Sequence, residues 1–125
     1  MEKARILIVD DESAYRETLR LLVPYEGYEV ETASTEQEAF DIAQRFSPNV
    51  LVIDWLLNDR TDGLEVAEKL RKNHPQMQVV VISGYPAASL EQRARSFSGV
   101  QFLTKPFALS ALFQAIRTAL AQREP

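Results

Sequence analysis

The segment VLVIDW, residues 50–55, shows how this chain is built. Four apolar residues, three of them β-branched, lead directly into the acidic Asp54. A run that is apolar on both faces is typical of a strand in a parallel sheet that helices cover on each side. A carboxylate at the end of such a strand is costly unless another group binds it. The segment therefore predicts a covered parallel sheet and a binding partner for Asp54.

Short apolar segments of the same kind recur along the chain and alternate with helical patterns. Thr35 and Glu38 form a capping box that opens one helix, and Pro24 and Gly27 are expected to end an earlier one. Because a strand–helix order repeated five times requires right-handed crossovers, it predicts an open α/β sheet with helices on both faces. We expect strands at residues 4–10, 28–33, 50–54, 78–83 and 100–104.

Composition and charge limit the function classes that fit. With 125 residues, 46% hydrophobic and 26% charged, the chain is expected to form one globular domain over residues 1–125. It contains no cysteine, which excludes disulfide and thiolate chemistry and favours a reducing compartment. The N-terminal apolar run is too short for a signal peptide or membrane span, so we expect a cytoplasmic protein without a membrane partner. A net charge of −4 without basic clusters argues against nucleic-acid binding.

Reactive side chains stand at the end of four of the predicted strands. Asp10 and Asp11 follow the first strand, Asp54 ends the third, Ser83 ends the fourth and Lys105 follows the fifth. Carboxyl ends of parallel strands meet at one edge of the sheet, so we expect these groups in one pocket. Three carboxylates suit a hard ion such as Mg²⁺, and lysine and hydroxyl groups bind phosphoryl oxygens. A carboxylate in such a site can itself become an aspartyl phosphate.

Four motifs together resemble the receiver domain of two-component response regulators. They are ILIVDDE, VLVIDW, VVVISGYP and FLTKPF, each at the end of a predicted strand, and the resemblance covers about residues 4–121. It implies a flavodoxin-like three-layer sandwich, with a five-stranded parallel sheet in the order 2-1-3-4-5 and five helices. It also implies a signalling switch, which promotes only its own phosphorylation and dephosphorylation and is not otherwise an enzyme.

The resemblance assigns a role to each residue of the predicted pocket. Asp54 is expected to accept phosphate from a sensor histidine kinase or phosphotransfer protein, with Mg²⁺ as cofactor. Asp11 is expected to bind the metal directly, Asp10 mainly through water, and Leu56 through its backbone carbonyl. Lys105 is expected to pair with Asp54 and then with the phosphoryl group.

A second group of residues is expected to carry the signal away from the site. The resemblance implies that Ser83 moves to the phosphoryl group and Phe102 changes rotamer, and that the Lys105–Pro106 bond is cis. The face formed by helix 4, strand 5 and helix 5 is then expected to bind a downstream effector or output domain, or a second copy as a homodimer. Polar residues expected near that face are Glu91, Arg95, Gln101 and Arg117.

This chain departs from the family pattern at three places. Position 83 is Ser where Thr is common, and position 102 is Phe where Tyr is common, so Phe102 cannot make a hydroxyl hydrogen bond. The segment LNDRTDG, residues 57–63, lacks the usual proline and makes the connection between Asp54 and Gly63 one residue longer than is common.

Other functions use related chemistry or a related sheet. A Mg²⁺-dependent aspartyl-phosphate phosphatase or hydrolase is the alternative, but such enzymes usually carry a second acid where this chain has Leu56. A flavin-binding module would need a Ser-, Thr- and Gly-rich phosphate loop, whereas DDESAY, residues 10–15, is acidic. A receiver that is never phosphorylated would not need the complete set of strand-end residues.

Overall fold

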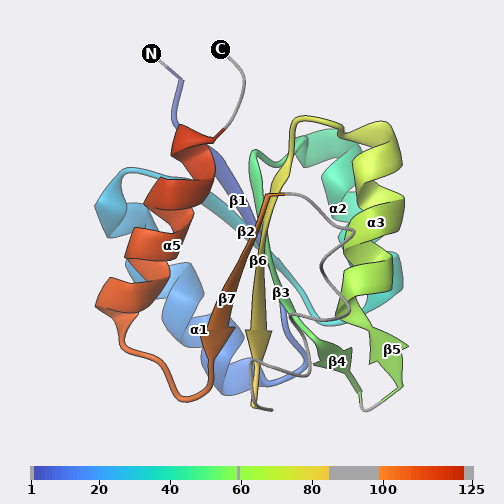
Figure 1. The fold of residues 1–125 in the computed structure, drawn as a ribbon, viewed down its shortest axis with the longest axis horizontal. Coiled ribbons are helices and arrows are strands. Elements are labelled where there is room, and N and C mark those ends of the chain that lie inside the picture. The colour runs from blue at the N-terminus through green and yellow to red at the C-terminus, as the bar shows by residue number, and fades with distance from the viewer. Residues whose placement is uncertain (1, 59, 85–98, 123–125) are drawn as a thin grey trace.

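A parallel sheet between two layers of helices forms the core of the protein (Figure 1). The structure, a computed structural model, describes residues 2–58, 60–84 and 99–122. The sheet has the order β2-β1-β3-β6-β7, and every neighbouring pair is parallel. This confirms the predicted order, since the labels β4 and β5 belong to a separate hairpin. The strands are β1 (Arg5–Val9), β2 (Glu29–Ala33), β3 (Val50–Asp54), β6 (Gln78–Ser83) and β7 (Val100–Thr104).

Helices cover both faces of this sheet. In Figure 1, α1 (Ser13–Leu22) and α5 (Leu109–Ala121) lie on one side, and α2 (Glu36–Phe46) and α3 (Gly63–Asn73) lie on the other. The helix expected between the last two strands, with its stripe of Leu90, Ala94 and Phe97, lies outside the described residues. Among the described helices, none is both long and apolar enough to span a membrane.

Side chains of the inner strands alternate between two buried clusters. In β1, Leu7 and Val9 pack with residues of α2 and α3, while Ile6 and Ile8 pack with residues of α1 and α5. All four are essentially inaccessible to solvent. The strands are therefore apolar on both faces because each face is a core, and the predicted three-layer arrangement is confirmed.

Helix ends follow the predicted sequence signals with one refinement. The Thr35 side chain accepts a hydrogen bond from the Glu38 backbone N–H at 3.1 Å, as expected of a helix N-cap. At the end of α1 the chain continues as the 3-10 helix η1 (Val23–Glu26), which includes Pro24. Gly27 then ends this turn with a φ of 90°, a conformation that glycine adopts readily.

The connection after Asp54 forms a small hairpin that the sequence did not predict. Strands β4 (Leu56–Leu57) and β5 (Thr61–Asp62) pair antiparallel at the lower edge of the sheet in Figure 1. Leu57 is fully buried, and Asn58 has a φ of 54°. The Asp62 carboxylate caps α3 by accepting from the Leu64 backbone N–H at 2.9 Å. The described residues of this connection thus form a structured element between β3 and α3.

Gly63 touches the backbone of the strand that carries Asp54, so we predict that this position tolerates no side chain. A Cβ at Gly63 would overlap the backbone carbonyl oxygen of Asp54. Gly63→Ala should lower the free energy of unfolding by about 2 kcal/mol, measured by urea denaturation, because the strand or the helix must shift.

Gly84→Ala is the matched control, because a Cβ there would meet nothing within 4 Å among the described residues. It should change the free energy of unfolding by no more than about 0.5 kcal/mol. Equal losses in the two variants would show that the close approach at Gly63 is not what limits that position.

Candidate functional site

Residues from the carboxyl ends of separate strands meet in one cavity, as the sequence predicted. Asp54 ends β3, Ser83 ends β6, and Lys105 directly follows β7. The cavity has a volume of about 200 Å³. Its lining residues are Asp11, Glu12, Asp54, Leu56, Ser83, Gly84 and Lys105.

The Asp54 carboxylate is held at the wall of this cavity by its backbone. Asp54 is only 8% exposed. The next residue, Trp55, donates its backbone N–H to Ile82 in β6 at 2.8 Å and accepts from the Gly63 N–H at 2.6 Å. Burial and the nearby negative charge of Asp10 raise the pKa of Asp54 to about 6, although Lys105 offsets part of the rise. The site thus favours any cation that reaches Asp54.

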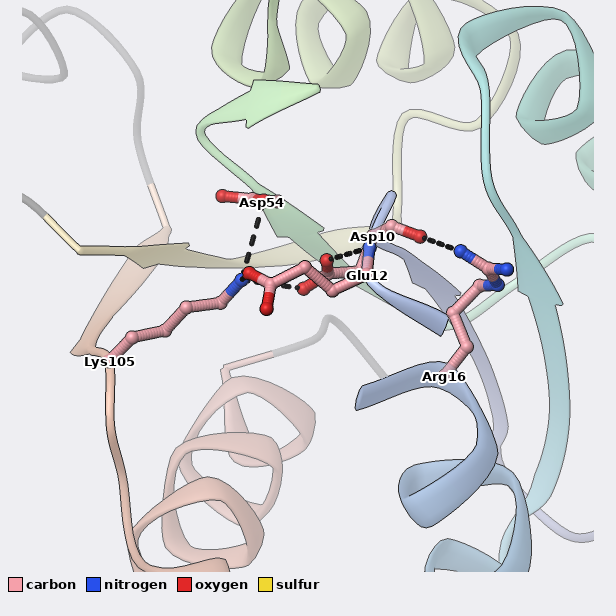
Figure 2. Close-up of polar contacts among 5 residues, drawn as sticks. All are labelled: Asp10, Glu12, Arg16, Asp54 and Lys105. Carbon is pink, nitrogen blue, oxygen red and sulfur yellow. Dashed lines mark hydrogen bonds and ion pairs between the residues drawn. The ribbon is translucent and has the colours of Figure 1, made fainter. Parts of the chain in front are cut away.

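Among the residues that the structure describes, Lys105 is the cation that reaches Asp54 (Figure 2). Its Nζ lies 2.7 Å from a Glu12 oxygen, 3.1 Å from an Asp10 oxygen and 3.4 Å from an Asp54 oxygen. It also lies 4.3 Å from the centre of the Tyr15 ring. Burial alone would lower the pKa of Lys105, but hydrogen bonds with Glu12 and Asp10 raise it above its usual value. The ammonium group therefore stays charged and links three acidic side chains.

Asp10 lies behind the cavity and is fixed from several directions. It is 2% exposed, and its carboxylate accepts from the Glu12 backbone N–H at 2.9 Å. Arg16 on α1 donates to the backbone carbonyl of Asp10 at 2.7 Å (Figure 2). Burial raises the pKa of Asp10, while the Glu12 N–H and Lys105 favour its charged form. Asp10 is therefore a rigid counter-charge for Lys105.

Three carboxylates stand close enough together to hold a metal ion. Single oxygens of Asp10, Glu12 and Asp54 lie within 4.8 Å of one another. An all-oxygen, acidic donor set of this kind suits a hard divalent cation such as Mg²⁺. Asp11 lines the cavity but is not part of this close group, so its direct contact to a metal stays a prediction. The role of the Leu56 carbonyl stays a prediction too.

Glu12 is the site residue that sequence reasoning missed. It stands third in the acidic run 10–12 and reads as an ordinary exposed acid before a helix. The structure places its carboxylate at the cavity and within 2.7 Å of Lys105, a residue far away in sequence. The only signal in the sequence was that the acidic run has three members.

The predicted switch residues lie on neighbouring strands, Ser83 at the end of β6 and Phe102 in the middle of β7. Ser83 is buried at the cavity, and its carbonyl accepts from the Lys105 backbone N–H at 2.8 Å. The Lys105–Pro106 bond is cis, as predicted. Phe102 is half-buried and packs against the cluster beneath α2 and α3, and it does not line the cavity. Movement of Ser83 and Phe102 on activation stays a prediction.

Comparison with known proteins identifies the family. Residues 6–117 match the family described as response regulator receiver domain. The chain belongs to this family. This receiver domain is 36% identical over 121 residues to the response regulator MprA of Mycobacterium leprae, covering 97% of the chain and 53% of that protein. It therefore spans about half the length of the curated relatives it matches.

Solved structures agree with this assignment. A CheY-like receiver domain protein from Methanospirillum hungatei superposes with a TM-score of 0.86 at 29% identity, covering 97% of this chain and 96% of that chain. NtrX from Brucella abortus superposes with a TM-score of 0.86 at 30% identity, covering 96% of this chain but 27% of that one. These matches thus include one solved chain covered almost completely by this fold and one in which the fold is a small part.

The raised pKa of Asp54 predicts a pH-dependent stability in the absence of metal. Because the folded protein binds this proton more tightly than the unfolded chain, the stability contributed by Asp54 falls as pH rises from about 4 to about 6. Asp54→Asn removes the charge while Lys105 keeps Asp10 and Glu12 as partners. With a chelator at neutral pH, the variant should be more stable than wild type by about 1 kcal/mol.

Urea denaturation across that pH range measures the difference. The gain should shrink toward about pH 4, where the unfolded aspartate also becomes protonated. Asp41→Asn, which neutralises an exposed acid on α2, is the control and should show no such trend. An Asp54→Asn variant less stable than wild type at neutral pH would contradict the prediction.

Proposed function

We propose that this receiver domain accepts a phosphoryl group on Asp54 from a sensor histidine kinase or phosphotransfer protein. The supporting observation is the buried Asp54 carboxylate, which lies 3.4 Å from Lys105 and shares its cavity with this lysine and with the acids Asp11 and Glu12. A nucleophile, a fixed cation and metal-binding oxygens are the parts that phosphoryl transfer needs. A cytoplasmic location belongs to the proposal, because histidine kinases draw their phosphoryl groups from ATP.

The chemistry requires little more than alignment and charge neutralisation. An oxygen of Asp54 forms a bond to phosphorus as the bond from phosphorus to the histidine nitrogen of the donor breaks, and the electron pair leaves with the imidazole. Lys105 neutralises charge on the phosphoryl oxygens, and the rigid end of β3 keeps the carboxylate aligned. Asp10, Asp11, Asp54 and the Leu56 carbonyl would hold Mg²⁺, which when bound offsets negative charge on the phosphoryl group.

The alternative, a phosphatase or hydrolase acting on other substrates, has less support. Those enzymes use a second acid two residues after the nucleophile as a proton donor, and here the apolar Leu56 lines the cavity at that position. Phosphoryl transfer to the domain itself needs no such donor. We therefore infer a switch that turns over only its own phosphoryl group.

Signal output is proposed to use the face of β7, α5 and the segment before β7. A downstream effector, an output domain or a second copy of the chain would bind there after Ser83 and Phe102 move. Gln101 lies on β7, but Arg117 pairs with Glu26 of η1 at 3.6 Å, so this side chain points toward η1. Glu91 and Arg95 lie outside the described residues. Size measurements with a beryllofluoride phosphoryl mimic would test for a homodimer.

Phosphorylation of Asp54 should be observable directly. Incubation with acetyl phosphate and Mg²⁺ should add one phosphoryl group per chain, detected by intact mass spectrometry, because the site aligns donor and carboxylate. Asp54→Asn should abolish the added mass, whereas Asp41→Asn on the exposed face of α2 should not. A phosphoryl group that persists in Asp54→Asn would place the acceptor elsewhere.

The phosphorylated state should decay slowly, because Leu56 lines the cavity with an apolar side chain that excludes water from the phosphoryl group. Leu56→Asn should speed hydrolysis about tenfold, since an amide can orient water. The measurement is phosphate release from the purified phosphoprotein in Mg²⁺. Tyr85, two residues after Ser83, is expected to shield the phosphoryl group as well, and it lies outside the described residues.

Leu21→Asn is a matched control for Leu56→Asn, because Leu21 is 59% exposed on α1 and does not line the cavity. Its hydrolysis rate should equal that of wild type. Decay of the wild-type phosphoprotein within seconds would argue against shielding by Leu56.

A further inference from the structure

Glu12 makes the shortest contact of the three that hold the Lys105 ammonium group. Its oxygen lies 2.7 Å from Nζ, compared with 3.4 Å for the oxygen of Asp54. A lysine ammonium has only three N–H donors, and three carboxylates already surround this one. A phosphoryl oxygen on Asp54 can gain a full contact from Lys105 only if one of these acceptors gives way.

We propose that Glu12 is a positioning residue that holds Lys105 toward the cavity mouth until phosphorylation draws it away. The inference rests on the proposed function of Asp54 as phosphoacceptor. In this arrangement Glu12 slows phosphorylation, because transfer must break the contact between Glu12 and Lys105.

The surroundings single out Glu12 as the acceptor that is released. Asp10 has a side chain that is 3% exposed and is fixed by the Glu12 backbone N–H, so it cannot leave Lys105 easily. The Glu12 side chain is 55% exposed, and water screens its attraction to the ammonium group. Asp54 is the residue that receives the phosphoryl group, and of the other two contacts the one at Glu12 is therefore the less costly to break.

Tyr15 keeps Lys105 in reach while its acceptors change. The ammonium group lies 4.3 Å from the centre of the Tyr15 ring, and this ring stacks on Phe107 with centroids 5.6 Å apart. Attraction between a cation and a ring face has no fixed acceptor, so Nζ can shift toward Asp54 without losing it. The movement needed is a short displacement between neighbouring carboxylates.

Glu12 also affects the approach of the donor. It lines the cavity beside Asp54, so an anionic phosphodonor meets a negative charge there. This repulsion acts through solvent and weakens with salt. The contact to Lys105 needs the full length of the glutamate side chain, whereas the repulsion needs only the charge, so the two effects are separable.

The first test compares phosphorylation rates by acetyl phosphate at saturating Mg²⁺, where any change in metal affinity has no effect. Glu12→Gln should react about fivefold faster than wild type. Glu17→Gln, which removes a charge from an exposed α1 residue paired with Arg20, is the control and should match wild type. A Glu12→Gln rate equal to or below that of wild type would overturn the proposal.

Glu12→Asp separates positioning from repulsion, because it keeps the charge but shortens the side chain. The proposal expects Glu12→Asp to react faster than wild type as well, since the shorter carboxylate cannot hold Lys105 in place. If Glu12→Asp matched wild type while Glu12→Gln were faster, repulsion alone would explain the rates and positioning would be excluded.

A second test needs neither metal nor phosphoryl transfer. Crystal structures of metal-free wild type and Glu12→Gln should show Nζ of Lys105 closer to Asp54 in the variant, and an unchanged position would overturn the proposal. This readout also separates the two hypotheses. If wild type took up no phosphoryl group, the proposed function would fail, while the position of Lys105 would still decide the role of Glu12.

Discussion

The burial of the Asp54 carboxylate is the constraint on which the rest of the site depends. In β3, the four residues before Asp54 are inaccessible to solvent. The strand therefore places the negative charge of Asp54 at the edge of the sheet, beside a second buried acid, Asp10. Burial raises the pKa of each of these carboxyl groups, and for Asp54 the nearby charge of Asp10 adds to the rise. Lys105, directly after β7, offsets part of this cost, and a bound metal cation would offset it further. The buried negative charges that lower the stability of the metal-free protein therefore favour the binding of a cation.

Backbone hydrogen bonds around Asp54 hold its carboxylate in a defined position despite the unfavourable charge. Hydrogen bonds of Trp55 to β6 and to Gly63 hold the turn after β3 from both sides. The β4–β5 hairpin places Leu56 at the cavity and buries Leu57, so the lengthened connection is anchored in the core. A nucleophile on such a scaffold needs little reorganisation before it reacts. Of the three acids that contact Lys105, Glu12 has the most exposed side chain.

Much of the fold and of the site could be predicted from local patterns in the sequence. The apolar runs have the length and composition of covered strands, and all five lie within one residue of their predicted bounds. Strand ends then placed Asp54, Ser83 and Lys105 together, since parallel strands direct their carboxyl ends to one edge. The hairpin after Asp54 could not be predicted, because its strands have two residues each and show no periodicity.

The sequence by itself determined which groups the sheet edge carries, because strand periodicity and motif order are local properties of the chain. Only the tertiary structure decided which of these charged side chains contact one another. Glu12 and Lys105 are 93 positions apart, and no local pattern relates their side chains. The same holds for Arg117, whose side chain pairs with Glu26 of η1, a residue far away in the sequence. Side-chain partners across the fold depend on rotamers and on competition among neighbouring acceptors, and these exist only once the helices have packed on the sheet.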